Sequence, residues 1–378
     1  MDHILGFASY LGPAIVVMTV VVFVHELGHY LVAKWAGVRV VTFSIGFGPE
    51  IFGWNDRSGT RWKVAWLPLG GFVRFFGDAD ASSKPDVEAI AEMSDADKSV
   101  SFQHKPLGWR FAVVAAGPLA NFLFSVVVLS GLFIAFGQPF TPPVVGSVAL
   151  DSAGAEAGLL VGDRIVSIDG SSIERFEDMQ ALVRLNQGTP LAMVIQRQGN
   201  EISLTATPKV TTTTDTFGNT QRLGLLGVSR SAAEYVHRSP PAAVYYSVRE
   251  IASIIDMTLT HMSQMVRGQR GTEDLGGVLR IGEMSGQMAQ AGLVTLIWFT
   301  AMISVNLGLI NLFPVPMLDG GHLLFYAFEA LRGKPLGERI QEYGFRLGLV
   351  MVLSLMVFAT WNDLVHFRIV AFVSGLLS

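Results

Sequence analysis

Residues 15–33 read IVVMTVVVFVHELGHYLVA, which places the polar group HELGH inside a long apolar stretch. Its two histidines, His25 and His29, are four residues apart, so a helix puts both rings on one face with Glu26 beside them. This HExxH spacing suits a zinc ion. Ionisable side chains inside an apolar span are energetically costly, so they indicate a functional site. The structural alternative is a hydrogen-bonded polar cluster between helices.

A catalytic zinc site normally has three protein ligands and one open position, so two histidines do not complete it. The chain has no cysteine, which leaves His, Asp or Glu as the third ligand. Asp319 follows a 35-residue charge-free run in the motif NLFPVPMLDGGH, whose prolines cannot continue a helix and whose glycines let the backbone turn. His322 is a competing ligand, and spacing does not choose between them. A carboxylate would give the His₂-carboxylate set of hydrolytic zinc enzymes.

Only 15% of the 378 residues are charged, against roughly 25% in an ordinary soluble domain, which excludes a purely soluble enzyme. The net charge of −4 gives no electrostatic case for a nucleic-acid partner. A helix needs ~20 mostly apolar residues to cross a bilayer. We therefore predict an α-helical polytopic membrane protein with about four transmembrane helices, at 4–33, within 111–150, within 284–318 and at about 344–362. A cleaved signal peptide is the alternative for the first stretch, although no Lys or Arg precedes it.

The distribution of Lys and Arg predicts the orientation of these spans. Ten basic residues lie in 34–110 and four in the short segment 332–346, whereas residues 1–12 contain none. Both basic segments are therefore predicted to be cytoplasmic. Both termini and the long 138–283 segment are then extracytoplasmic. The basic residues of this long segment do not contradict the prediction, because long segments are translocated largely regardless of their charge.

Residues 141–209 alternate short β-type runs with turn residues, which predicts a small β-rich domain. The string AGAEAGLLVGDRIVSIDG resembles the PDZ domains of bacterial proteases, which implies binding of a peptide or chain end by strand addition. TTTT at 211–214 is interpreted as a linker. The stretch 242–266 has apolar residues at helical spacing and is predicted to lie on the membrane surface or against the PDZ-like domain. The predicted domains are an N-terminal membrane region (1–140), the PDZ-like domain (141–209), a linker and amphipathic helix region (210–283), and a C-terminal membrane region (284–378).

Five motifs together resemble one known family. They are HELGH at 25–29, SIGFGPEIFG at 44–53, PLGGFVRFFG at 68–77, AGPLANF at 116–122 and NLFPVPMLDGGH at 311–322. They resemble the site-2 protease family of intramembrane zinc metalloproteases, and most of all its bacterial regulator of sigma-E group. The resemblance implies that zinc (Zn²⁺) is bound by His25, His29 and Asp319 and that Glu26 is the catalytic base. It also makes His322 a neighbour rather than a ligand.

The same resemblance implies a substrate and a location. The substrate would be a single-span membrane protein in the lipid bilayer, of the anti-sigma factor type and already trimmed outside, with remnant signal peptides as a second possibility. The protein would be a multi-pass protein of the bacterial inner (plasma) membrane. The best-studied members of the group carry two tandem PDZ domains, whereas this sequence shows one.

Further residues are candidates for holding the substrate. Asn311 could donate a hydrogen bond to the substrate backbone or to the developing oxyanion, or could simply join two helices. Asn121 has the same two interpretations. In PLGGFVRFFG, we expect a membrane-associated β-hairpin in which Gly70, Gly71 and Phe72 pair with an extended substrate strand. The alternative is a hairpin that only packs on the spans.

Two other functions remain open from the residues alone. A non-catalytic PDZ scaffold would explain recruitment of partners but leaves Glu26 without a use. A metal transporter would also place His and Asp in the membrane.

Between the hairpin and the second span, residues 82–99 are polar and acidic, and a mobile loop is predicted there.

Overall fold

The computed structural model describes residues 2–79, 86–214, 220–231, 234–268 and 276–366. The chain divides into two compact units, each described here by itself. Unit 1 comprises Met1–Ser130, Val244–Leu259 and Asp274–Ser378, and unit 2 comprises Gly131–Ala243 and Thr260–Glu273.

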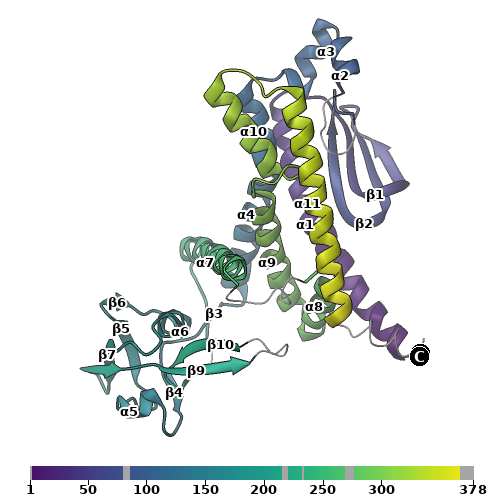
Figure 1. Ribbon diagram of the computed structural model, residues 1–378. Helices are drawn as coiled ribbons and strands as arrows, with labels where there is room; N and C mark the ends of the chain where they lie inside the picture. The colour runs from purple at the N-terminus through teal and green to yellow at the C-terminus, as the bar shows by residue number, and fades with distance from the viewer. Residues whose placement is uncertain (1, 80–85, 215–219, 232–233, 269–275, 367–378) are drawn as a thin grey trace, which may run out of the picture. The chain divides into compact units, whose positions relative to one another are not determined.

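Four helices, lying mostly in unit 1, are long and apolar enough to cross a membrane, as the sequence predicts. They are α1 (Asp2–Trp35), α4 (Leu107–Ala135), α9 (Leu293–Asn311) and α11 (Glu338–His366), and Figure 1 labels each of them. The predicted third region contains two helices, because Gly292 has a φ of 123° and separates α8 (Val278–Ala291) from α9. Residues that carry a side chain rarely adopt this backbone conformation, so glycine is suited to the break.

The turn after α9 reverses the chain and presents Asp319. The motif's two prolines lie in this turn, and Met317 has a φ of 87°. The next helix, α10, begins with the predicted ligand (Asp319–Arg332). A Cβ on Gly321 would lie 2.5 Å from the Val315 carbonyl oxygen, so the turn and the first residues of α10 pack without room for a side chain.

A long hairpin packs beside α1, formed by antiparallel β1 (Val40–Asn55) and β2 (Arg61–Phe75). Asp56 in its turn accepts hydrogen bonds from the Tyr30 hydroxyl of α1 at 2.9 Å and from Trp62 Nε1 at 3.0 Å. Burial alone would raise the pKa of Asp56, but hydrogen bonds, including these two and those from Ser58 and Thr60, lower it below its usual value. The hairpin is therefore tied to α1 one residue after the second histidine of the HExxH motif.

The prediction of a mobile loop at 82–99 is wrong for most of this stretch. Residues Val87–Ala91 form α2 and Asp95–Val100 form α3. The side chains of Asp86 and Ser94 accept hydrogen bonds from the first turns of these helices and cap them, which a reading based on polarity alone does not detect. Positions 82–85 lie outside the described residues.

Unit 2 is built on a four-stranded antiparallel sheet with the order β6-β5-β7-β8. Strands β11 and β12 follow residue 209, and they pair with β4 and β3 respectively. The TTTT segment is part of a strand paired with β10 rather than a linker. The elements are β3 (Gln138–Phe140), β4 (Val145–Val148), α5 (Ala153–Glu156), β5 (Arg164–Ile168), β6 (Ser171–Ser172), α6 (Phe176–Leu185), β7 (Leu191–Arg197), β8 (Asn200–Ala206), β9 (Lys209–Thr214), β10 (Thr220–Leu225), β11 (Val228–Arg230) and β12 (Glu234–Val236).

The amphipathic stretch predicted at 242–266 is helical and forms α7 (Pro240–Val266). Over its middle it is joined to two of the apolar helices. Ser130 of α4 donates to the Ser247 hydroxyl at 3.1 Å, and Thr258 donates to Asn306 of α9 at 3.0 Å. The central portion of α7 therefore belongs to the helical unit.

Unit 2 contains an ion pair between a buried carboxylate, Asp163, and a partly exposed arginine, Arg197. Asp163 is only 1% exposed and accepts two hydrogen bonds of 2.7 Å from Arg197 and one of 2.8 Å from the Leu160 backbone. The Arg197 guanidinium holds the pKa of this carboxyl below its usual value. The pair therefore stabilises the folded state above pH ~4, the pKa of an unfolded Asp, and this contribution is lost as the pH falls through the lowered pKa.

We expect Asp163→Asn to lower the free energy of unfolding at pH 7 by about 2 kcal/mol, because it weakens charge-assisted hydrogen bonds inside a core. Thermal unfolding of the full chain, followed by circular dichroism, measures this. The difference from wild type should shrink below pH ~4. The control Glu156→Gln disrupts the exposed pair with Lys209 and should cost under about 1 kcal/mol. Equal effects of the two substitutions would contradict the assignment.

Candidate metal centre

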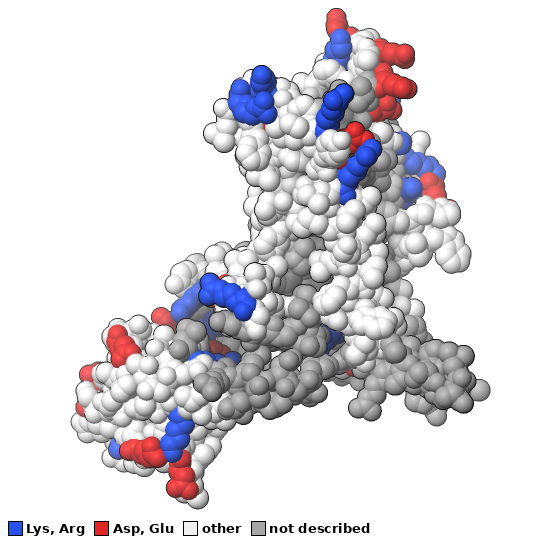
Figure 2. All heavy atoms as spheres, in the orientation of Figure 1, with Lys and Arg blue, Asp and Glu red and all other residues white. Residues whose placement is uncertain are grey.

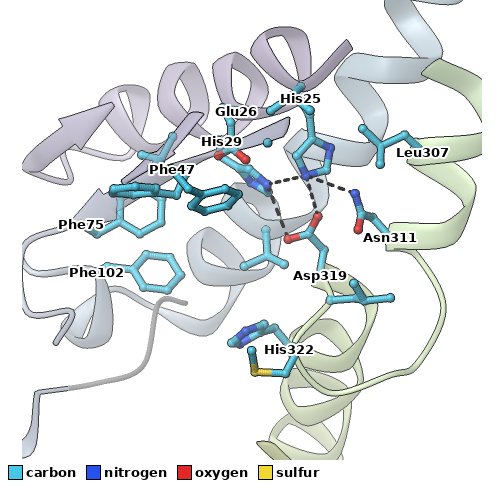
Figure 3. A pocket seen from close by; sticks show the side chains of 18 residues that line it. His25, Glu26, His29, Phe47, Phe75, Phe102, Leu307, Asn311, Asp319 and His322 are labelled. Atoms are coloured by element: carbon cyan, nitrogen blue, oxygen red, sulfur yellow. Dashed lines mark hydrogen bonds and ion pairs between the residues drawn. The ribbon is translucent and has the colours of Figure 1, made fainter. Parts of the chain in front are cut away.

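The metal candidates come from two helices of unit 1 that the chain brings together. His25 and His29 lie one turn apart on α1 and are 7% and 9% exposed. Asp319, the first residue of α10, faces them, so the three residues form a group whose ligand atoms all lie within 4.8 Å of one another. Figure 3 shows the two rings and the carboxylate pointing toward one another.

The spacing of the ligand atoms fits a single tetrahedral ion. His25 Nε2 lies 3.2 Å from His29 Nε2 and 3.1 Å from Asp319 Oδ2, and His29 Nε2 lies 3.5 Å from Asp319 Oδ1. Zinc bonds to His and carboxylate are about 2.0–2.1 Å long, which separates neighbouring ligands of a tetrahedron by about 3.3–3.4 Å. The donor set therefore fits zinc with one position left open, as a hydrolytic site needs.

The orientation of His29 is set by the backbone of α4. Its Nδ1 lies 2.8 Å from the Val113 carbonyl oxygen, which can only accept, so Nδ1 carries the proton and Nε2 presents a lone pair. Metal-ligating histidines are regularly held in this way. Residue type at position 113 is irrelevant to this bond, so no sequence signal could have identified it.

Gly117 of α4 lies directly against both histidines. A Cβ at this position would lie 2.9 Å from His25 Cε1 and still closer to His29 Nε2. No other residue type fits here unless the rings move. The resemblance in AGPLANF includes this glycine, but only the packing shows what it contacts.

Eight residues proposed from the sequence as base, ligands or substrate contacts line one cavity of about 430 Å³, which Asn121 does not line. They are His25, Glu26, His29, Gly70, Gly71, Phe72, Asn311 and Asp319. Strand β2 approaches the centre closely, because a Cβ on Gly71 would lie 3.2 Å from Glu26 Cγ. The hairpin backbone and the HExxH motif thus form adjoining sections of the same wall.

The competing ligand, His322, lines the cavity without joining the metal group of the described residues. Its ring packs against Phe345 of α11, with 5.3 Å between ring centroids. Asn311 at the end of α9 reaches the centre instead, with Nδ2 3.5 Å from His25 Nε2. Figure 3 shows both positions. The geometry favours Asp319 over His322 as the third ligand.

Comparisons with known proteins assign the chain to a family. The model of peptidase family M50 matches residues 13–355. One relative is a protein of Agrobacterium fabrum that is named a zinc metalloprotease. It is 45% identical over 95% of this chain and 97% of its own length. Metalloprotease MmpA of Caulobacter vibrioides is 34% identical over 99% of this chain and 100% of its own.

Among solved structures, the PDZ domain of an SdrC-like protein from Listeria monocytogenes is 17% identical and matches 25% of this chain and 90% of that domain, with a TM-score of 0.20.

The family match covers most of the chain, including every motif quoted above. With its four apolar helices and its His-His-Asp group, the chain belongs to peptidase family M50, the site-2 protease family, and is a zinc metalloprotease.

Proposed function

We propose that this protein hydrolyses a peptide bond within the transmembrane segment of a single-span membrane protein, with zinc held by His25, His29 and Asp319. The observation that carries the proposal is the position of the three ligands. They face a cavity between α1, α9, α10 and β2, and two of these helices are apolar enough to span a membrane. A substrate that reaches this cavity must itself enter the apolar region of the protein.

Zinc, when bound, lowers the pKa of a coordinated water and polarises the scissile carbonyl. Glu26 lies beside the ligands on α1 and lines the cavity. In the proposed reaction its carboxylate takes the proton of the attacking water and then delivers it to the nitrogen of the leaving amine.

Asn311 is proposed to hold the substrate carbonyl. Its Nδ2 lies 3.5 Å from His25 Nε2, an atom that has no lone pair to offer once it ligates a metal. The amide is then free to donate to an oxygen near the open position, where negative charge develops during hydrolysis. Helix packing alone does not require a side chain that faces the cavity.

Strand β2 is proposed to hold the unwound substrate. The described strands of this sheet are only two, and β1 occupies one edge of β2, with Ile45 opposite Gly71. No second described strand pairs with residues 70–72, which line the cavity, and we propose that the substrate strand is added there. An extended chain bound at this edge would present its backbone next to Glu26.

The hairpin's attachment to α1 gives a test of this role. We expect Asp56→Ala to lower kcat/KM on a membrane substrate about 10-fold to 100-fold, because small displacements of a positioning element reduce rates strongly. Zinc affinity should be unchanged, since Asp56 bonds to Tyr30 and Trp62 and not to the ligands. The control Arg57→Ala changes the exposed neighbour in the same turn. Loss of zinc in Asp56→Ala would show that the turn supports the metal centre instead.

The proposed orientation follows from charge. On the face shown in Figure 2, charged side chains of unit 1 gather around α2, α3 and α10, beyond the uncharged sides of the apolar helices. We propose that this end is cytoplasmic, in the inner membrane of a bacterium, and that unit 2 and both termini are extracytoplasmic. Unit 2 would act as the PDZ-like domain that binds a peptide or a newly exposed chain end, and a trimmed anti-sigma factor is the proposed substrate class.

The experiment is incubation of the purified protein with a single-span anti-sigma factor in detergent, with and without a chelator. We expect cleavage inside the span that stops on chelation and returns with zinc. Cleavage only outside the span would contradict the proposed substrate site. Zinc flux into liposomes without cleavage would indicate a transporter, and tight zinc binding with neither activity would indicate a scaffold.

A further inference from the structure

The two zinc-facing histidines differ in what holds their second nitrogen. His29 Nδ1 lies against a backbone carbonyl oxygen, that of Val113, at 2.8 Å. His25 Nδ1 lies 3.3 Å from the side-chain amide of Asn121 on α4. A backbone carbonyl is always present, whereas the partner of His25 depends on the residue type at position 121.

Metal ligation decides which atom of the Asn121 amide must face His25. A neutral imidazole that binds a metal through Nε2 carries its proton on Nδ1 and needs an acceptor there. The amide NH₂ only donates, so the oxygen has to take that place. The two orientations of an asparagine amide differ only in the exchange of O and N.

Burial supports the same assignment. Asn121 is completely buried, and its Oδ1 has no hydrogen-bond partner among the described residues when the NH₂ group faces His25. An unpaired buried acceptor costs about 1–3 kcal/mol. Rotation of the amide by half a turn places Oδ1 against the Nδ1 proton of His25 and gives this acceptor a partner.

The backbone carbonyl of Asn121 is held from its own helix, α4, and from α9. Its carbonyl oxygen accepts hydrogen bonds from the Ser125 hydroxyl at 2.9 Å and from the Ser304 hydroxyl at 3.2 Å. Gly308 allows this close approach, since a Cβ there would lie 3.3 Å from the Asn121 Cβ. The amide therefore has a fixed position beside the His25 ring.

We propose that Asn121 is a positioning residue for the metal centre: its Oδ1 accepts the Nδ1 proton of His25, fixes the ring orientation and directs the Nε2 lone pair to zinc. The inference rests on the zinc ligation by His25 proposed above. Asn121 does not touch the substrate. Its effect is expected on metal affinity first and on cleavage only through the metal.

The test compares two substitutions of similar size at position 121. Asn121→Leu removes the acceptor and should weaken zinc binding roughly 10-fold to 100-fold, measured by chelator competition on the purified protein. Asn121→Asp keeps an acceptor and should bind zinc within about threefold of wild type. The control Ser130→Ala removes a buried hydrogen bond of the same helix, the one to Ser247, away from the metal centre, and should leave zinc affinity unchanged. If Asn121→Leu does not fold, Asn121→Ala removes the same acceptor.

Two further measurements separate a positioning role from a general structural one. Thermal unfolding of the zinc-free proteins should show that Asn121→Asp and Asn121→Leu are both folded, and the visible spectrum of bound Co²⁺ should change only where the acceptor is lost. Equal zinc affinity of Asn121→Leu and wild type, or equal weakening by both substitutions, would overturn the proposal. If His25→Ala binds zinc as tightly as wild type, His25 is not a zinc ligand, and the proposed role of Asn121 is overturned as well.

Discussion

Glu26→Gln should lower the rate of peptide-bond cleavage roughly 10²-fold to 10⁴-fold while the protein keeps its zinc. The substitution preserves the shape of the side chain but removes the carboxylate that takes the proton of the attacking water. Glu26 lines the cavity beside the metal group but is not one of its three ligands, so metal affinity should not fall. Cleavage of a single-span substrate by purified protein, with the zinc content of each sample, measures both expectations.

The exposed Glu88 on α2 provides the control, because Glu88→Gln makes the same chemical change away from the cavity. It should cleave as wild type does. Cleavage by Glu26→Gln at a comparable rate would show that another group acts as the base. Loss of zinc in Glu26→Gln would show that the carboxylate belongs to the metal centre.

Gly117→Ala is expected to weaken zinc binding strongly and, with it, cleavage. The added methyl group would overlap His29 Nε2 and lie 2.9 Å from His25 Cε1, so at least one ring has to leave its position. Displacement of a ligand by a fraction of an ångström should weaken zinc binding by roughly 10²-fold or more. Loss of a contact that positions a ligand has an effect of similar size. Chelator competition measures the affinity, and the substrate assay measures the activity.

A second glycine of the same helix makes a matched control. Nothing lies within 4 Å of a Cβ built on Gly131 of α4, and a helix gains up to about 1 kcal/mol when glycine becomes alanine. Gly131→Ala should therefore keep zinc and activity. Wild-type zinc affinity in Gly117→Ala would mean that α4 and α1 can separate without cost, and the packing described here would be wrong.

Local patterns were sufficient for much of the fold. The HExxH spacing and the four apolar stretches depend on residues that are neighbours along the chain, and the structure contains the four helices they predict. The two short helices α2 and α3 were missed because single capping side chains, Asp86 and Ser94, define them in a polar segment. The TTTT strand was missed because only its pairing with β10 distinguishes it from a linker.

The sequence by itself determined the metal chemistry: two histidines at helical spacing, a carboxylate beside them, no cysteine, and an apolar setting. Residue spacing did not separate Asp319 from His322, and only the family resemblance implied the choice. The tertiary structure supports that choice, because Asp319 joins the two histidines whereas the His322 ring packs on Phe345. It also brought Asn311 to His25 across 286 positions of the chain. Such contacts depend on how helices pack, and packing is decided by residues such as Gly117, whose contribution is the absence of a side chain.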